Sequence, residues 1–339
     1  MLTFNQFRSK FKGKGLSNGQ IGKLWSQYKD GEMTDLDLTE KNIEKLILSA
    51  PKKIVVRRVS PIRKYNKIDP DYISKVPPEI ARQMLFKLEI NDIMKMCSIN
   101  KYFEKKVCTT YFWKLYVNNI HKNLNTIFIE ASKNGYTEIV KVLLQNKQVN
   151  PGVNNNKAII IASKNGHLEV VKELLKDKRV DPSANSNRAV IMASQFGRAA
   201  VVKLLLSDTR VDPNASYNYA IGLAASNGYL SVVKLLLRDG RVNPGAYANE
   251  AIIEAAGNGH LEVVKELIGN SRVDPSDYNN KAIIVASENG YLDVVRVLLK
   301  DKRVDPSDQN NYAVRLALKN KHTKIFKLLA SDPRVNWYK

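Results

Sequence analysis

The feature that most restricts the fold is a set of residues that recur every 31 positions, as from Gly135 to Gly166. Glycine, proline and valine keep this interval without a gap, at Gly135, Gly166, Gly197, Gly228, Gly259 and Gly290, at Pro151, Pro182, Pro213, Pro244, Pro275 and Pro306, and at Val149, Val180, Val211, Val242, Val273, Val304 and Val335. A segment this short cannot bury its own apolar face. We therefore expect the copies to stack into one elongated solenoid with a shared core.

One copy indicates that each repeat is a pair of helices. Residues 158–164 are mostly apolar, and Asn156 just before them is expected to cap a helix by accepting a backbone N–H. Gly166 tolerates left-handed backbone angles, so the first helix is expected to end there. Residues 168–176 place apolar and charged side chains at helical spacing, which predicts a second helix with one buried face. Pro182 then prevents that helix from continuing.

The second predicted helix resembles the signature of the ankyrin family, in NGHLEVVKELL (165–175), NGYLSVVKLLL (227–237) and NGHLEVVKELI (258–268). The resemblance implies an all-α ankyrin-repeat solenoid of about seven 31-residue units over residues 121–339. The repeat is shorter than the family's usual length of about 33 residues, which leaves open a different hairpin geometry. This short form with V-D-P at the turn looks like ankyrin proteins of large DNA viruses that infect amoebae, which implies a viral protein that acts in a host cell.

Positions that recur in every copy are expected to serve the stack. We assign a structural role to the recurring asparagine and arginine, at Asn156, Asn187, Asn218, Asn249, Asn280 and Asn311 and at Arg179, Arg210, Arg241, Arg272, Arg303 and Arg334. His167, His260 and His322 share one position of the repeat, and we expect hydrogen bonds within a repeat there rather than metal binding or catalysis. Lys321 replaces the glycine of the last copy, as is typical of a terminal repeat that exposes one face.

Positions that differ between copies are free to contact a partner. They are the third, fourth and sixth residues after each proline, and tyrosines gather there in the middle copies. In the ankyrin family this hairpin and the adjoining helix line the concave binding face. The resemblance therefore implies that an unknown target protein is contacted by Tyr217, Tyr219, Tyr247, Glu250 and Tyr278. The alternative is that these are solvated loop tyrosines.

Residues 76–115 read VPPEIARQMLFKLEINDIMKMCSINKYFEKKVCTTYFWKL, which predicts an extended start, three short helices and a surplus apolar face for a partner. The stretch resembles an F-box, with Val76 where leucine is usual and matches at Pro77, Glu79, Ile80, Leu85, Leu88, Asp92, Ile93, Ile99, Asn100, Lys101, Phe103 and Trp113. The resemblance implies a module over residues 73–120 that contacts the Skp-type adaptor of a cullin ubiquitin ligase through Pro77, Glu79, Ile80, Leu85 and Leu88. The alternative is an ordinary helical cap on the solenoid.

The remaining N-terminal residues are strongly basic, in a chain whose formal net charge is +21. We expect a small helical segment over residues 1–50 and a basic linker over residues 51–72. The Lys/Arg-rich stretch over residues 51–67 is compatible with a nuclear-import or nucleic-acid patch, and equally with a solvated linker.

No phosphate-binding glycine loop, metal-ligand cluster or nucleophile–base pattern occurs in the sequence, so we expect neither an enzyme nor a bound cofactor or metal. The leading hypothesis is an interaction scaffold that serves as the substrate-recognition subunit of an SCF-type ubiquitin ligase. The alternatives are an ankyrin protein that binds a host factor without a ligase link, and a basic scaffold associated with nucleic acid. The fold class alone cannot decide among them.

The sequence also predicts a compartment. No apolar stretch resembles a secretory signal or is long enough to span a bilayer. The two cysteines, Cys97 and Cys108, are too few for a disulfide framework. We therefore expect a reduced setting, the host cytoplasm or nucleus, with no secretion and no membrane contact.

Overall fold

The computed structural model describes residues 92–93, 97, 107–119 and 123–336. The chain divides into two compact units, residues 1–118 and 119–339. The predictions for residues 1–50, residues 51–72 and the five adaptor-contacting positions (Pro77, Glu79, Ile80, Leu85 and Leu88) lie outside the described residues. None of the helices in the described ranges has the length and hydrophobicity needed to cross a bilayer.

The described part of the first unit is an aromatic cluster on helix α7 (Thr110–Asn119). The side chains of Phe112, Trp113 and Tyr116 are buried, and their ring centroids lie 4.9 to 6.0 Å apart. A disulfide joins Cys97 to Cys108, whose Cα atoms lie 5.9 Å apart, a separation that suits such a bond. The structure thus differs from the reduced cysteines that we expected, because the fold brings together two residues that the sequence separates by 11 positions.

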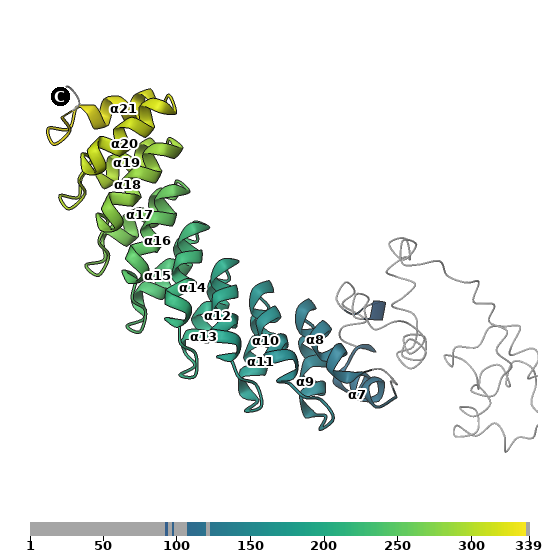
Figure 1. Cartoon of the computed structure of the whole chain (residues 1–339). Coiled ribbons are helices and arrows are strands. Elements are labelled where there is room, and N and C mark those ends of the chain that lie inside the picture. The colour runs from purple at the N-terminus through teal and green to yellow at the C-terminus, as the bar shows by residue number, and fades with distance from the viewer. Residues whose placement is uncertain (1–91, 94–96, 98–106, 120–122, 337–339) are drawn as a thin grey trace, which may run out of the picture. The chain divides into compact units, whose positions relative to one another are not determined.

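The second unit is a stack of helix pairs (Figure 1). The first helix of each pair is α8 (Leu124–Asn134), α10 (Val153–Asn165), α12 (Ala184–Gln195), α14 (Ala215–Ser226), α16 (Ala246–Gly257), α18 (Asp277–Asn289) or α20 (Asp308–Lys319). The second helix is α9 (Thr137–Gln145), α11 (Leu168–Lys176), α13 (Ala199–Leu206), α15 (Leu230–Arg238), α17 (Leu261–Ile268), α19 (Leu292–Leu298) or α21 (Thr323–Ala330). First helices pack on first helices and second helices on second helices, in chain order. The prediction of an all-α solenoid is confirmed for this part of the chain.

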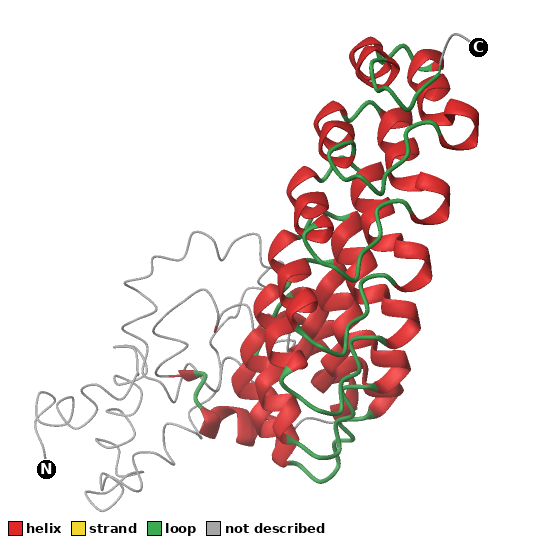
Figure 2. Cartoon of the chain, turned by 90° about the vertical axis from the view of Figure 1, so that its left-hand side faces the viewer, coloured by secondary structure: helices red, strands yellow, loops and turns green. Residues whose placement is uncertain are grey.

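The core lies between neighbouring pairs and repeats with the sequence. On α11 the side chains of Val170, Val171 and Leu174 are buried, as the helical spacing predicts. Val180 in the following loop is also buried, as are its counterparts in the other copies. Figure 2 looks onto the loops that connect successive pairs, which run between the two columns of helices. The positions that vary from copy to copy follow these loops, at the start of each first helix from α10 to α20.

Each first helix from α10 to α20 begins with one left-handed turn. Asn185, Ser186 and Asn187 have φ angles of 55°, 56° and 60°, and the Asn187 N–H donates to the Ser183 carbonyl over 2.7 Å. The same conformation recurs at residues 154–156, 216–218, 247–249, 278–280 and 309–311. No strand occurs in residues 123–336, so this turn stands where the family would have a hairpin. The right-handed part of each first helix begins with the next residue.

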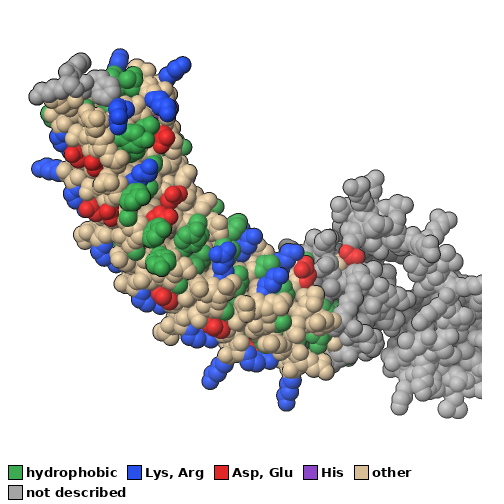
Figure 3. Space-filling view, in the orientation of Figure 1, with side chains coloured by type: hydrophobic (Ala, Val, Ile, Leu, Met, Phe, Trp, Pro, Cys, Tyr) green, Lys and Arg blue, Asp and Glu red, His purple; other side chains and the backbone are tan. Residues whose placement is uncertain are grey.

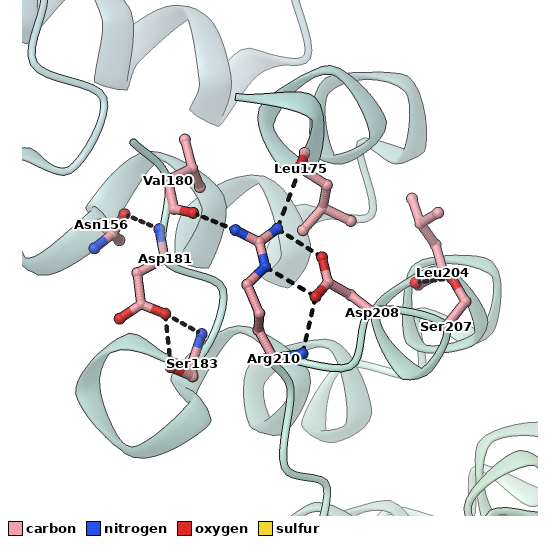
Figure 4. Close-up of polar contacts among 9 residues, drawn as sticks. All are labelled: Asn156, Leu175, Val180, Asp181, Ser183, Leu204, Ser207, Asp208 and Arg210. Atoms are coloured by element: carbon pink, nitrogen blue, oxygen red, sulfur yellow. Dashed lines mark hydrogen bonds and ion pairs between the residues drawn. The ribbon is translucent and has the colours of Figure 1, made fainter. Parts of the chain in front are cut away.

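The left-handed turn changes the role of the recurring asparagine. An N-cap residue has extended backbone angles, whereas Asn156 has φ 60° and ψ 37°. Its Oδ1 instead accepts the backbone N–H of Asp181 over 2.8 Å (Figure 4). The N-cap prediction for Asn156 was therefore wrong, although the asparagine is structural, because it ties the start of a repeat to its end.

The recurring arginine joins one repeat to the one before it. The Arg210 guanidinium donates to the carbonyl oxygens of Val180 and Leu175 in the preceding repeat, over 2.9 and 3.3 Å (Figure 4). It also pairs with Asp208 over 2.7 Å, and this bond lowers the pKa of the Asp208 carboxyl. The structural role predicted for this arginine agrees with these contacts.

Candidate partner-binding surface

The variable positions fall on two kinds of backbone. The third and fourth residues after each proline lie in the left-handed turn, and the sixth is the first residue of the right-handed helix. The third position holds Asn154, Asn185, Ser216, Tyr247, Tyr278 and Gln309; the fourth Asn155, Ser186, Tyr217, Ala248, Asn279 and Asn310; the sixth Lys157, Arg188, Tyr219, Glu250, Lys281 and Tyr312. The same backbone thus carries a different side chain in each repeat.

Three tyrosines occupy the left-handed turns of the middle repeats. Tyr217, Tyr247 and Tyr278 have φ angles of 59°, 54° and 50°, which bulky residues rarely adopt. Their side chains are 78%, 66% and 65% exposed, so little burial offsets the backbone strain. Asparagine, which tolerates this conformation best among residues with a side chain, stands at the same positions in other copies. We therefore expect these tyrosines to make the isolated chain less stable than asparagine would at the same positions.

Four of the five predicted target-binding residues line one groove. Tyr217, Tyr219, Tyr247 and Glu250 border a groove of about 680 Å³. The rings of Tyr217 and Tyr247 lie 5.8 Å apart and come from successive repeats. Tyr278 is exposed but is not part of the groove's lining. In Figure 3 hydrophobic side chains gather over the middle of the array, with charged side chains nearby.

The groove also contains Arg188, which we did not include among the target-binding residues. Arg188 occupies the same sixth position as Tyr219 and Glu250, and this shared position is the signal that could have identified it. At the other side of the groove, burial and the neighbouring carboxylate of Glu254 raise the pKa of Glu250. The groove therefore combines aromatic surface with one basic and one acidic side chain.

The histidines belong to the stack. The Nε2 atom of His260 lies 2.9 Å from the Ser226 carbonyl oxygen of the preceding repeat, and His167 makes the equivalent contact with Lys133 over 2.8 Å. The prediction that these histidines form hydrogen bonds within one repeat was therefore wrong, because the bonds join two successive repeats. In the part of the chain that the structure describes, no group of His, Cys, Asp and Glu side chains could hold a metal ion.

Comparison with known families agrees with this architecture. A family model described as ankyrin repeats in three copies matches residues 106–186, 127–217, 221–310 and 252–337. No curated protein matches the chain. The matched ranges include the residues that line the groove, except Tyr219, which lies between two of the ranges.

Proposed function

Because the chain belongs to the ankyrin-repeat family, we propose that it holds a target protein in its tyrosine-lined groove and presents that target to an SCF-type ubiquitin ligase. Ankyrin repeats indicate a protein–protein interaction scaffold, and proteins of this kind are generally not enzymes. The proposal assigns the two tasks to different parts of the chain. Residues 73–120 dock on a Skp-type adaptor, and the repeats select the target.

The groove carries the target-binding half of the proposal. Tyr217 and Tyr247 are large, exposed and held on unfavourable backbone, although asparagine stands at these positions in other repeats. Tyrosine offers a wide contact area with a polar end, which suits the central residues of a protein interface. A surface of this kind is retained at a cost to stability when a partner uses it.

The F-box resemblance carries the ligase half. Ile93 and Trp113, two of the matched positions, are 0% and 3% exposed, as expected for apolar side chains inside such a module. Pro77, Leu85 and Leu88 are the positions that we propose to contact the adaptor. The ubiquitin-transfer chemistry belongs to other subunits of the ligase.

Calorimetric titration of the full chain with a purified Skp-type adaptor tests this proposal. Wild type is expected to bind, Leu85→Asp to lose binding, and Tyr217→Asn to bind as wild type does, because the groove is not used for the adaptor. A wild-type chain that does not bind any Skp-type adaptor would remove the ligase link. The chain would then be an ankyrin scaffold that binds its target without a ligase.

A further inference from the structure

The sixth position after proline forms a row across three successive repeats. It holds Arg188 on α12, Tyr219 on α14 and Glu250 on α16, and all three side chains line the groove. The first helices pack side by side in this order. Packed helices lie about 8–10 Å apart, so two steps separate the basic from the acidic residue by roughly 16–20 Å. Tyr219 lies between them.

Neither charged residue of this row has a partner within the array. Arg210 and Arg241 pair with Asp208 and Asp239, as is usual for the recurring arginines. Across residues 123–336, by contrast, no ion pair or side-chain hydrogen bond involves Arg188 or Glu250. Both residues are half-buried. Partly buried charges without partners lower stability unless a ligand supplies the opposite charge.

The carboxyl of Glu250 lacks a compensating positive charge within the array, and its pKa reflects this. Burial and the Glu254 carboxylate, one helical turn along α16, both raise its pKa. The Glu254 carboxylate accepts a hydrogen bond from the neutral hydroxyl of Ser226 over 3.0 Å, and no ion pair among residues 123–336 involves Glu254. A cation beside Glu250 would replace the water that this carboxylate has lost.

We propose that the groove binds an extended segment of the target that carries an acidic residue opposite Arg188 and a basic residue opposite Glu250. This inference rests on the proposed function and adds the chemistry of the bound segment. An extended chain advances about 3.3 Å per residue, so the acidic and basic residues stand roughly five or six positions apart. An apolar or aromatic side chain between them packs on Tyr217, Tyr219 and Tyr247, which also line the groove.

The chain supplies its own matched variants for a test. Arg188→Glu introduces the residue that another repeat has at Glu250, and Glu250→Lys introduces the residue found at Lys157 and Lys281. The uncharged variants Arg188→Tyr and Glu250→Tyr copy Tyr219 and Tyr312. Each substitution is therefore compatible with the repeat, and thermal unfolding by circular dichroism verifies that each variant is folded. If a reversed charge disrupts folding, the uncharged variant at that position replaces it.

The probe is a displayed library of random twelve-residue peptides, selected on the full chain. We expect the enriched peptides to contain an acidic and a basic residue at the spacing given above. Fluorescence anisotropy should show that each charge variant binds these peptides at least about tenfold more weakly, as expected when one member of a charge pair is lost. Selection on Arg188→Glu should replace the acidic residue of the peptides by a basic one.

The outcomes separate this inference from the proposed function. Peptides that bind both charge variants as tightly as wild type, but lose binding to the Tyr217→Asn/Tyr247→Asn variant, would overturn the charge pairing and leave the groove as the target site. Peptides that bind wild type and all of these variants equally would overturn both. Loss of binding to the charge variants together with an exchanged consensus supports the inference.

Discussion

The Nη1 atom of Arg210 donates a 2.9 Å hydrogen bond to the carbonyl oxygen of Val180, which belongs to the preceding repeat. The same two atoms meet at every later junction, as Arg241 with Val211, Arg272 with Val242, Arg303 with Val273 and Arg334 with Val304. Because each repeat contacts only its neighbours, contacts of this kind set the stability of a solenoid. The array is therefore held together by a small set of contacts that recur at each junction. A junction that lacks one of these contacts shows what the contact adds to stability.

One departure is at Arg272, where Asn270 replaces the usual aspartate. We expect Asn270→Asp to complete the ion pair and stabilise the chain by about 0.5 kcal/mol at pH 7, a small value because such pairs are partly exposed. The bond from arginine lowers the pKa of the corresponding aspartates, so this gain should be present above the ordinary pKa and disappear as the pH falls through the lowered one. Urea unfolding at pH 7 and near pH 2 measures it. A gain that persists at the lower pH would contradict the ion-pair explanation.

The recurring glycine lies against a side chain of the next repeat. A Cβ atom on Gly228 would lie 2.6 Å from Nδ1 of His260, and its φ is +73°. We expect Gly228→Ala to destabilise the chain by roughly 2 kcal/mol. Lys321 has the same position in the last repeat with φ 62°, and Lys321→Gly should stabilise by about 1 kcal/mol by relieving that backbone. Thermal unfolding of Gly228→Ala and Lys321→Gly, each compared with wild type, measures both changes in stability. Changes of the same sign in the two variants would contradict the prediction.

Within residues 123–336, three buried serines, Ser163, Ser194 and Ser287, lack hydrogen-bond partners. The Oγ atoms of Ser163 and Ser194 are fully buried and unpaired, whereas the equivalent position is alanine at Ala225 and Ala256. An unsatisfied buried hydroxyl is unfavourable, so Ser163→Ala and Ser194→Ala should each stabilise by about 1 kcal/mol. Ser132 is the control, because its hydroxyl donates to the Phe128 carbonyl oxygen over 2.8 Å. Ser132→Ala should therefore be neutral or destabilising, and a gain equal to that of the other two would argue against this explanation.

The raised pKa of Glu250 gives a prediction for pH. A raised pKa means that the fold favours the protonated carboxyl, so stability is lost as the pH rises through that pKa. We expect Glu250→Gln to raise the melting temperature at pH 7 and to have little effect near pH 3, where both chains carry a neutral side chain. Glu262, which pairs with Lys265, is the matched position at which Glu→Gln should not stabilise. If Glu250→Gln raised the melting temperature only at low pH, the pH dependence would be opposite to the predicted one.

The repeat, its helix pairs and most buried positions could be predicted from the sequence, because apolar spacing and recurring glycine and proline are local signals. The left-handed turn could not. Asparagine ends every such turn, but Ser186, Tyr217 and Ala248 do not favour positive φ, so the local signal is incomplete. The conformation is fixed by bonds between distant residues, such as Asn187 Oδ1 with the Asp212 N–H over 2.8 Å.

Contacts between repeats were the other source of error. The sequence separates His260 from Ser226 by a full repeat, so the partner of its ring could not be identified before the stack was known. Arg188 shares the sixth position with Tyr219 and Glu250, so this position could have identified it, and the packing of α12 beside α14 places it in one groove with the tyrosines. The 31-residue periodicity predicts the fold, whereas the contacts between successive repeats determine which side chains line the groove.

The central claim is that exposed tyrosines are kept in left-handed turns for the sake of a partner. The most direct measurement compares wild type with the Tyr217→Asn/Tyr247→Asn/Tyr278→Asn variant, using residues found at these positions in other repeats. Melting temperature and binding of the library-selected peptides are measured on the same samples. The account predicts a higher melting temperature and loss of binding, since asparagine relieves the backbone but offers little contact area. A lower melting temperature with undiminished binding would contradict it.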